Sequence, residues 1–182
     1  MVQELLDKGA DSGTMSVLDR PYSFLAAALL LAARQGYVDL VQLLLDREAD
    51  GRGQALIQAA ANDRVDVMKL LLKRGVEADT QETSTGRPPG YTPLMGATMN
   101  GHLESMQLLL DYGAAINKRG PDGVTALALA ASSGRRKVVE FLLDRGADLN
   151  VRDFEGKTPL GRAKANNRND IVLLLKKAGA KE

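Results

Sequence analysis

The chain has 182 residues, of which 24 are basic and 23 acidic, so its formal net charge is +1. This balance gives no reason to expect nucleic acid or a membrane as the partner, and the absence of cysteine excludes disulfides, thiolate metal sites and a thiol nucleophile. Apolar residues make up 45% of the chain but aromatic residues only 4%, so the core has to be built from Leu, Ala and Val, which suits closely packed helices.

Residues 1–11 predict a single short helix followed by a turn. Val2, Leu5 and Leu6 are spaced for one helix face, and Gly9 follows them. A helix over residues 2–8 is too short to be stable alone, so we expect it to pack against the next element. It either caps a complete protein or belongs to the tail of a longer array, and the sequence leaves both alternatives open.

The run from Phe24 to Ala33 is apolar throughout and follows Arg20, as the core of a targeting signal would. It is too short to cross a bilayer, which takes about 20 residues, and it lies too far from the start for a secretory signal. It also lies in register with the repeats described next. We therefore predict a buried helix.

A repeating pattern continues to the C-terminus. Each copy has an apolar triplet or its near equivalent, one or two charged residues and a turn residue. These turn residues are Gly9, Glu48, Gly75, Gly113, Gly146 and Gly179, and their spacings are 39, 27, 38, 33 and 33 residues. Because Glu48 departs from the glycine pattern, we expect local backbone strain there.

The first half of each copy carries helix start and stop signals. Thr92-Pro93-Leu94 and Thr158-Pro159-Leu160 begin two copies, and Thr125-Ala126-Leu127 is a weaker version. Thr caps a helix N-terminus, and Pro fits the first turn. Residues that tolerate a left-handed backbone then end this helix, namely Gly36, Asp63, Gly101, Gly134 and Asn167. A second helix follows with an apolar stripe that includes Leu44, Leu71, Leu109, Leu142 and Leu175.

These motifs resemble the ankyrin-repeat family, whose period is about 33 residues. The resemblance implies an all-α solenoid of paired antiparallel helices with β-turn fingers, in five full repeats after an N-terminal half-repeat. We expect one domain over residues 1–182, with approximate units 1–11, 12–50, 51–79, 80–117, 118–150 and 151–182. The His that usually follows Thr-Pro-Leu is missing, and Met95, Ala128 and Gly161 stand in its place, which leaves the hydrogen-bond network of that His in question.

The predicted connections differ in length, and the last repeat carries lysines at unusual positions. Little more than residues 50–53 is expected between two of the helices, whereas residues 80–91 form a long finger and residues 12–22 another enlarged connection. These differences reflect either neutral drift or the shape of a partner. Lys164 and Lys176 stand where other copies have small or apolar residues, so we expect them to cap the solenoid.

No catalytic, cofactor-binding or metal-binding residue is expected, and we predict that the protein is not an enzyme. Gly156-Lys157-Thr158 resembles the end of a phosphate-binding loop, but Val151 stands where that motif needs a glycine. His102 is the sole histidine, has no candidate metal co-ligands and is expected at a turn between helices. The basic run 135–137 begins an outer helix and is interpreted as a solvated face.

The family resemblance implies that the chain binds another protein through its concave face and finger loops. From the charge balance we expect no nucleic acid or membrane partner, and we further expect a monomer in the cytoplasm. Tyr91, Met99 and Phe154 are the expected anchors, because aromatic side chains and Met concentrate binding energy, although packing of Phe154 against its own finger is an equal alternative. The other candidates are Arg34, Gln35, Asn62, Pro88, Pro89, Asn100, Asp122, Val124, Ser132, Ser133, Glu155 and Lys157. Two functions stay open: a scaffold or adaptor, or a dedicated inhibitor, for example an immunity-type protein, that blocks a specific enzyme.

Overall fold

The computed structural model describes residues 24–81 and 90–181, and within them ten α-helices form five antiparallel pairs without any strand. The first, or inner, helices of the pairs are α2 (Phe24–Gln35), α4 (Arg52–Ala61), α6 (Pro93–Asn100), α8 (Ala126–Ser133) and α10 (Pro159–Ala165). The second, or outer, helices are α3 (Val38–Asp46), α5 (Val65–Lys73), α7 (Leu103–Asp111), α9 (Arg136–Asp144) and α11 (Asn169–Lys177). The predicted half-repeat at residues 1–11 lies outside the described residues, as do Pro88 and Pro89 of the long finger.

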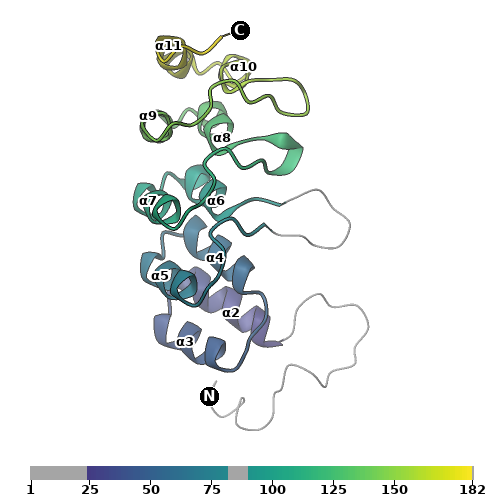
Figure 1. Ribbon diagram of the computed structural model, residues 1–182, viewed down its shortest axis with the longest axis vertical. Coiled ribbons are helices and arrows are strands. Elements are labelled where there is room, and N and C mark those ends of the chain that lie inside the picture. The colour runs from purple at the N-terminus through teal and green to yellow at the C-terminus, as the bar shows by residue number, and fades with distance from the viewer. Residues whose placement is uncertain (1–23, 82–89, 182) are drawn as a thin grey trace.

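The helix pairs stack into a solenoid. Figure 1 shows the inner helices in one column and the outer helices in a second, with the loops that lead into α8 and α10 on the same side of the molecule. Each inner helix packs against its own outer helix and against the inner helices of the neighbouring pairs, whereas successive outer helices touch less. The predicted all-α repeat solenoid is confirmed. Within the described residues, no helix is long and apolar enough to cross a membrane.

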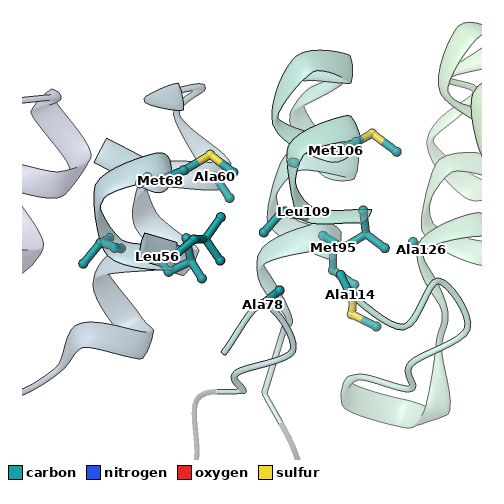
Figure 2. Packing of buried hydrophobic residues seen from close by; sticks show 14 of the residues in the cluster. Leu56, Ala60, Met68, Ala78, Met95, Met106, Leu109, Ala114 and Ala126 are labelled. Carbon is teal, nitrogen blue, oxygen red and sulfur yellow. The ribbon is translucent and has the colours of Figure 1, made fainter. Parts of the chain in front are cut away.

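The core repeats along the stack as the pattern of the sequence does. Every inner helix buries one leucine at the equivalent position, namely Leu29, Leu56, Leu94, Leu127 and Leu160. The predicted outer-helix leucines are buried as well: Leu44, Leu71, Leu109, Leu142 and Leu175. In Figure 2, Met68 of α5 and Met106 of α7 each reach toward the following pair. Since burying one such side chain stabilises a fold by about 1.5–3 kcal/mol, this shared core holds neighbouring pairs together.

The predicted helix starts at the threonines are confirmed. The hydroxyls of Thr92, Thr125 and Thr158 accept hydrogen bonds from backbone N–H groups three residues later, at 3.2, 3.3 and 3.1 Å. Pro93 and Pro159 occupy the first positions of α6 and α10, where a missing N–H is harmless. The local sequence therefore sets where α6, α8 and α10 begin.

The predicted left-handed turns are also confirmed. The backbone φ angles are 88°, 83° and 71° at Gly36, Gly101 and Gly134, and 56° and 57° at Asp63 and Asn167. Glu48 also has a positive φ, 59°, as its place in the glycine pattern predicted. For a glutamate this conformation is unfavourable by about 1–3 kcal/mol, so the strain expected there is present.

The connection between α3 and α4 is as short as predicted, but its boundary differs. Helix α4 already begins at Arg52, so Arg52 and Gly53 belong to its first turn rather than to the loop. Gly53 is needed there because a Cβ at this position would lie 2.3 Å from the Thr80 hydroxyl oxygen. The backbone of α4 can therefore approach the start of the next finger closely.

Met95 fills the position at which the family usually has His. Its side chain is 1% exposed, and its sulfur lies against Gly120, where an added Cβ would come within 2.5 Å of it. The contact joins α6 to the base of the following finger by van der Waals packing. A packed thioether thus takes the place of the polar contact that an imidazole would make.

Candidate protein-binding surface

Two finger loops, each of which leads into an inner helix, are described in full: residues 117–125 and residues 150–158, which we call together the finger ledge. Each loop is closed at its base by a backbone hydrogen bond, from the N–H of Gly120 to the carbonyl of Val124 at 2.9 Å and from the N–H of Asp153 to the carbonyl of Lys157 at 3.0 Å. Both loops project from the same side of the solenoid (Figure 1). The two loops are therefore closed in the same way, although Pro121–Gly123 in the first loop form a 3-10 turn in which Asp122 has a φ of 56°.

The two loops are tied to each other and to the finger before them. The N–H of Phe154 donates to the Asp122 carbonyl at 2.8 Å, and the Arg119 guanidinium donates to the Arg152 carbonyl. On the N-terminal side, the Gln81 amide donates to the carbonyls of Gly90 and Arg119 at 3.2 and 2.8 Å. The ledge is therefore one hydrogen-bonded unit rather than two independent loops.

Side chains of the preceding turns add a second set of ties at the base of the fingers. The Asp79 carboxylate accepts the backbone N–H of Ala115 at 2.9 Å. One pair further along, the Asn117 amide oxygen accepts the N–H of Asp148, also at 2.9 Å. The same contact thus recurs at equivalent positions, and each pair fixes the start of the next finger.

A buried carboxylate organises the last loop. Asp153 is 6% exposed and accepts the backbone N–H groups of Glu155 and Lys157 at 2.9 and 2.8 Å, as well as the Nε–H of Arg162. Burial by itself raises the pKa of Asp153, but the hydrogen bonds from Lys157 and Arg162 outweigh it and hold this pKa below its ordinary value. Asp153 therefore stays ionised and shapes the loop instead of facing a partner.

Phe154 lies on the ledge as an exposed aromatic ring. It is 70% exposed, yet one edge of the ring covers Gly123 of the preceding finger, where an added Cβ would lie 2.8 Å from a ring carbon. The Arg119 guanidinium stacks over the same ring, 5.8 Å from its centroid. The ring thus contacts the finger before it, a contact that neither of the two sequence-based alternatives for Phe154 included.

The expected anchors Tyr91 and Met99 are accessible, at 39% and 43% exposure. Tyr91 directly precedes the Thr92 cap, and Met99 lies in the last turn of α6. The neighbouring candidate Asn100 is committed to the scaffold, because its amide donates to the Ala61 carbonyl at 2.9 Å and to the Gly96 carbonyl at 3.2 Å. The side chain of Tyr91 is thus accessible just before helix α6, and the side chain of Met99 is accessible near the C-terminal end of the same helix.

The interpretation of Val124 as part of an exposed binding surface is wrong. Val124 is 4% exposed, whereas Lys157, at the equivalent position of the last finger, is exposed. Val124 is buried at the finger base, where its carbonyl accepts the Gly120 N–H and the following finger covers the adjacent Gly123. Lys157 has no finger after it within the described chain, and it pairs with Glu155 at 2.6 Å.

The other described candidates fall into two groups. Asn62 and Ser132 are half-buried and donate to carbonyls of their own helices, at 2.8 and 2.9 Å. The exposed candidates are Arg34, Gln35, Asp122, Ser133 and Glu155. Among the exposed candidates, Asp122, Phe154, Glu155 and Lys157 come together on the finger ledge, and the others lie at the ends of the inner helices.

Sequence reasoning missed Arg119 and Arg152, which lie next to Phe154 on the ledge. Arg119 precedes Gly120 and Arg152 precedes Asp153, so the two arginines hold the same position in successive fingers. That shared register is a signal the sequence already contained. What it did not contain is the stacking of Arg119 on a ring that follows it by more than 30 residues.

Two open hollows are found on the described surface. One, of about 220 Å³, is lined mainly by Arg152, Lys157, Thr158 and Lys164 at the last finger, and the other, of about 410 Å³, lies beside Asp63 and Arg64. His102 is at a turn, with its Nδ1 3.8 Å from an Asp63 oxygen. Across the described part of the chain, no three acidic or His side chains gather as metal ligands would.

One protein-family model matches along the whole chain. A family model described as ankyrin repeats matches in three copies, over residues 1–82, 56–153 and 123–182. No curated protein matches the sequence. The three matches together run from the first residue to the last.

Proposed function

Because the chain belongs to the ankyrin-repeat family, we propose that it is a binding module that holds another protein against its inner-helix ends and finger loops. Ankyrin repeats are generally protein–protein interaction modules and typically have no enzymatic activity. The observation that supports this surface most directly is the finger ledge, whose loops are hydrogen-bonded to each other before any partner arrives. A surface that is already ordered loses less conformational entropy on binding.

We propose a scaffold or adaptor as the role of this module, acting as a monomer in the cytoplasm. The uneven connections favour a second candidate, a dedicated inhibitor or immunity-type protein that blocks one enzyme. Only residues 47–51 join α3 to α4, whereas residues 74–92 join α5 to α6. Neighbouring connections of such different length suit one partner protein of matching shape better than a series of different partners.

Affinity capture with matched variants tests the binding surface. Truncating a central aromatic anchor weakens binding by about 2 kcal/mol, which is about thirtyfold in Kd. Tyr91→Ala is therefore expected to release a protein that the unmodified chain retains, with its melting temperature unchanged within experimental error. Arg136→Ala, on the outer helix α9, serves as the control because its partner is Glu140 of the same helix.

Titration calorimetry of the captured protein then separates the outcomes. If Arg136→Ala weakens binding and Tyr91→Ala does not, the partner uses the outer helices and the proposed surface is wrong. A captured enzyme whose turnover falls to zero at one equivalent supports the inhibitor, whereas unchanged turnover supports the scaffold or adaptor.

A further inference from the structure

The finger ledge differs in charge from the rest of the molecule. Residues 117–125 and 150–165, which comprise the ledge and helix α10, carry six basic and three acidic side chains, whereas the remaining chain carries 18 basic and 20 acidic ones. Two of the three acidic groups are already paired, Asp153 with Arg162 and Glu155 with Lys157. Asp122 is the third. An excess of positive charge is therefore concentrated at the C-terminal fingers of a nearly neutral protein.

Arg119 and Arg152 hold this charge in fixed positions. The Arg119 guanidinium donates to the Arg152 carbonyl and stacks on Phe154, and the Arg152 guanidinium donates to the Gly156 carbonyl at 2.8 Å. Neither side chain forms an ion pair among the described residues, and Lys118 beside them is exposed and also forms none. Each guanidinium has five N–H donors, so both keep donors for an incoming anion.

An apolar surface lies between these charges. Phe154 leaves most of its ring to solvent, and the hollow of about 220 Å³ opens next to Arg152 and Lys157. A ring that is stacked on one side and open on the other suits the aliphatic part of a ligand side chain. The ledge thus offers fixed positive groups around one apolar contact.

We propose that the finger ledge binds an acidic, partly apolar segment of the partner protein, with carboxylates on Arg119 and Arg152 and an apolar side chain over Phe154. This inference rests on the proposed function and names the chemistry of the partner. Guanidinium groups match carboxylates in bidentate geometry. A long nucleic acid fits less well, because beyond the ledge it would run onto a surface with more acidic than basic residues.

The outer-helix side of the molecule offers a matched control. Arg145 stacks on Phe141, with its guanidinium 4.7 Å from the ring centroid, and like Arg119 it forms no ion pair within the described chain. Lys137 of α9 is exposed and is also without an ion pair there. Two double variants therefore change the net charge by the same amount at different surfaces. These are Arg119→Glu/Arg152→Glu on the ledge and Lys137→Glu/Arg145→Glu at the outer helix α9.

The probe is a fluorescein-labelled 12-residue peptide made of four Glu-Leu-Glu repeats, titrated by fluorescence anisotropy. The ledge variant, Arg119→Glu/Arg152→Glu, is expected to raise the Kd about tenfold or more. The outer-helix variant, Lys137→Glu/Arg145→Glu, should raise it less than about threefold. Added salt should raise the Kd of the unmodified protein. A peptide of four Gln-Leu-Gln repeats should bind about tenfold more weakly. Circular dichroism checks the fold, and Arg119→Gln/Arg152→Gln replaces the ledge variant if that variant does not fold.

Three results would overturn the inference. The first is equal weakening by the ledge and outer-helix variants, and the second is no binding of the Glu-Leu-Glu peptide at millimolar protein. The third is tighter binding of a 12-residue oligothymidylate with the same dependence on Arg119 and Arg152. If the captured partner still depends on Tyr91 in any of these cases, the proposed function stands and only its acidic ligand is wrong. If the partner depends on neither Tyr91 nor the ledge, the proposed surface itself is wrong.

Discussion

At the scale of single residues, Asp153 links stability to pH. Its folded-state pKa lies below its ordinary value, because the hydrogen bonds that it accepts outweigh its burial. A carboxyl group of this kind stabilises the fold above the pKa of the unfolded chain, about 3.9. That stabilisation is lost as the pH falls through the lower, folded-state pKa. The last finger is therefore expected to loosen in acid before the helices that carry it.

Asp153→Asn should lower the free energy of unfolding by about 1–3 kcal/mol at pH 7, because the amide cannot accept all the hydrogen bonds of the carboxylate and leaves Arg162 without a counter-charge. The Arg162 side chain is 21% exposed, so water replaces part of what is lost. Urea unfolding at decreasing pH should show the variant and the parent converging below about pH 4. Asp46→Asn is the control, since the exposed Asp46 pairs with Arg74 at 2.9 Å on the surface. Equal effects of the two substitutions would contradict this account.

Two glycines of the ledge allow the cost of backbone strain to be distinguished from the cost of a side-chain clash. Gly123 and Gly156 hold the same position in successive fingers, with φ angles of 73° and 76°. An added Cβ would lie 2.8 Å from the Phe154 ring at Gly123, but at Gly156 nothing lies within 4 Å. The two positions therefore share a positive φ and differ in whether a following finger covers the glycine.

Alanine at either glycine should destabilise the protein by about 1–3 kcal/mol through the positive φ. Gly123→Ala should lose more than Gly156→Ala, because it also displaces Phe154, and it should weaken binding of the Glu-Leu-Glu peptide further. Urea unfolding and anisotropy measure the two effects. If Gly156→Ala equals Gly123→Ala in both, Phe154 does not depend on Gly123.

At the scale of elements, the last helix pair presents a face unlike the others. Lys164 is exposed at a position where α2, α4, α6 and α8 bury Ala33, Ala60, Thr98 and Ala131. Lys176 is exposed where α3 and α5 bury Leu45 and Leu72. Both lysines lie where a further helix pair would pack. They keep this face from offering an apolar surface.

Lys164→Ala/Lys176→Leu should make the protein self-associate, because an apolar end face without a following pair seeks another apolar surface. Light scattering over a range of protein concentrations measures this. Lys137→Ala/Lys177→Leu makes the same chemical changes at positions that are polar or exposed in the other pairs, and it should leave the protein as dispersed as the parent. Equal association of both double variants would show that added apolarity alone is responsible.

How far the sequence predicts the structure depends on how far apart the interacting residues lie. The Thr92 cap, the Gly101 turn and the positive φ of Glu48 follow from residues within a few positions, and all three predictions are confirmed. The burial of Val124, next to the Gly123 that the following finger covers, was missed. The stack of Arg119 on Phe154 of that following finger was missed as well. Contacts between fingers depend on how the pairs stack, and no short motif records them.

At the scale of the whole molecule, stability is expected to be local. Inner helices contact only their neighbours in the stack, so the array behaves as a chain of coupled pairs. The pair α10–α11 has a neighbour on one side only within the described residues, whereas α6–α7 has one on each side. The finger ledge belongs to the last two pairs, so its order depends on the less supported end of the array.

Leu160→Ala tests this, because Leu160 is 1% exposed in α10 and its truncation should destabilise that pair by about 2–5 kcal/mol. Hydrogen exchange followed by mass spectrometry should become faster in α10, α11 and residues 150–158, with α2 and α4 unchanged. Leu94→Ala in α6, a leucine 2% exposed at the equivalent position, should instead speed exchange in the pairs on both sides. Leu160→Ala should also weaken binding of the Glu-Leu-Glu peptide, because the acidic ligand needs the last finger to be ordered. Of the two variants, only Leu160→Ala should combine this loss of affinity with normal exchange in α4. If Leu160→Ala speeds exchange evenly from α2 to α11, the array unfolds as one cooperative unit and the ledge shares the stability of the whole molecule.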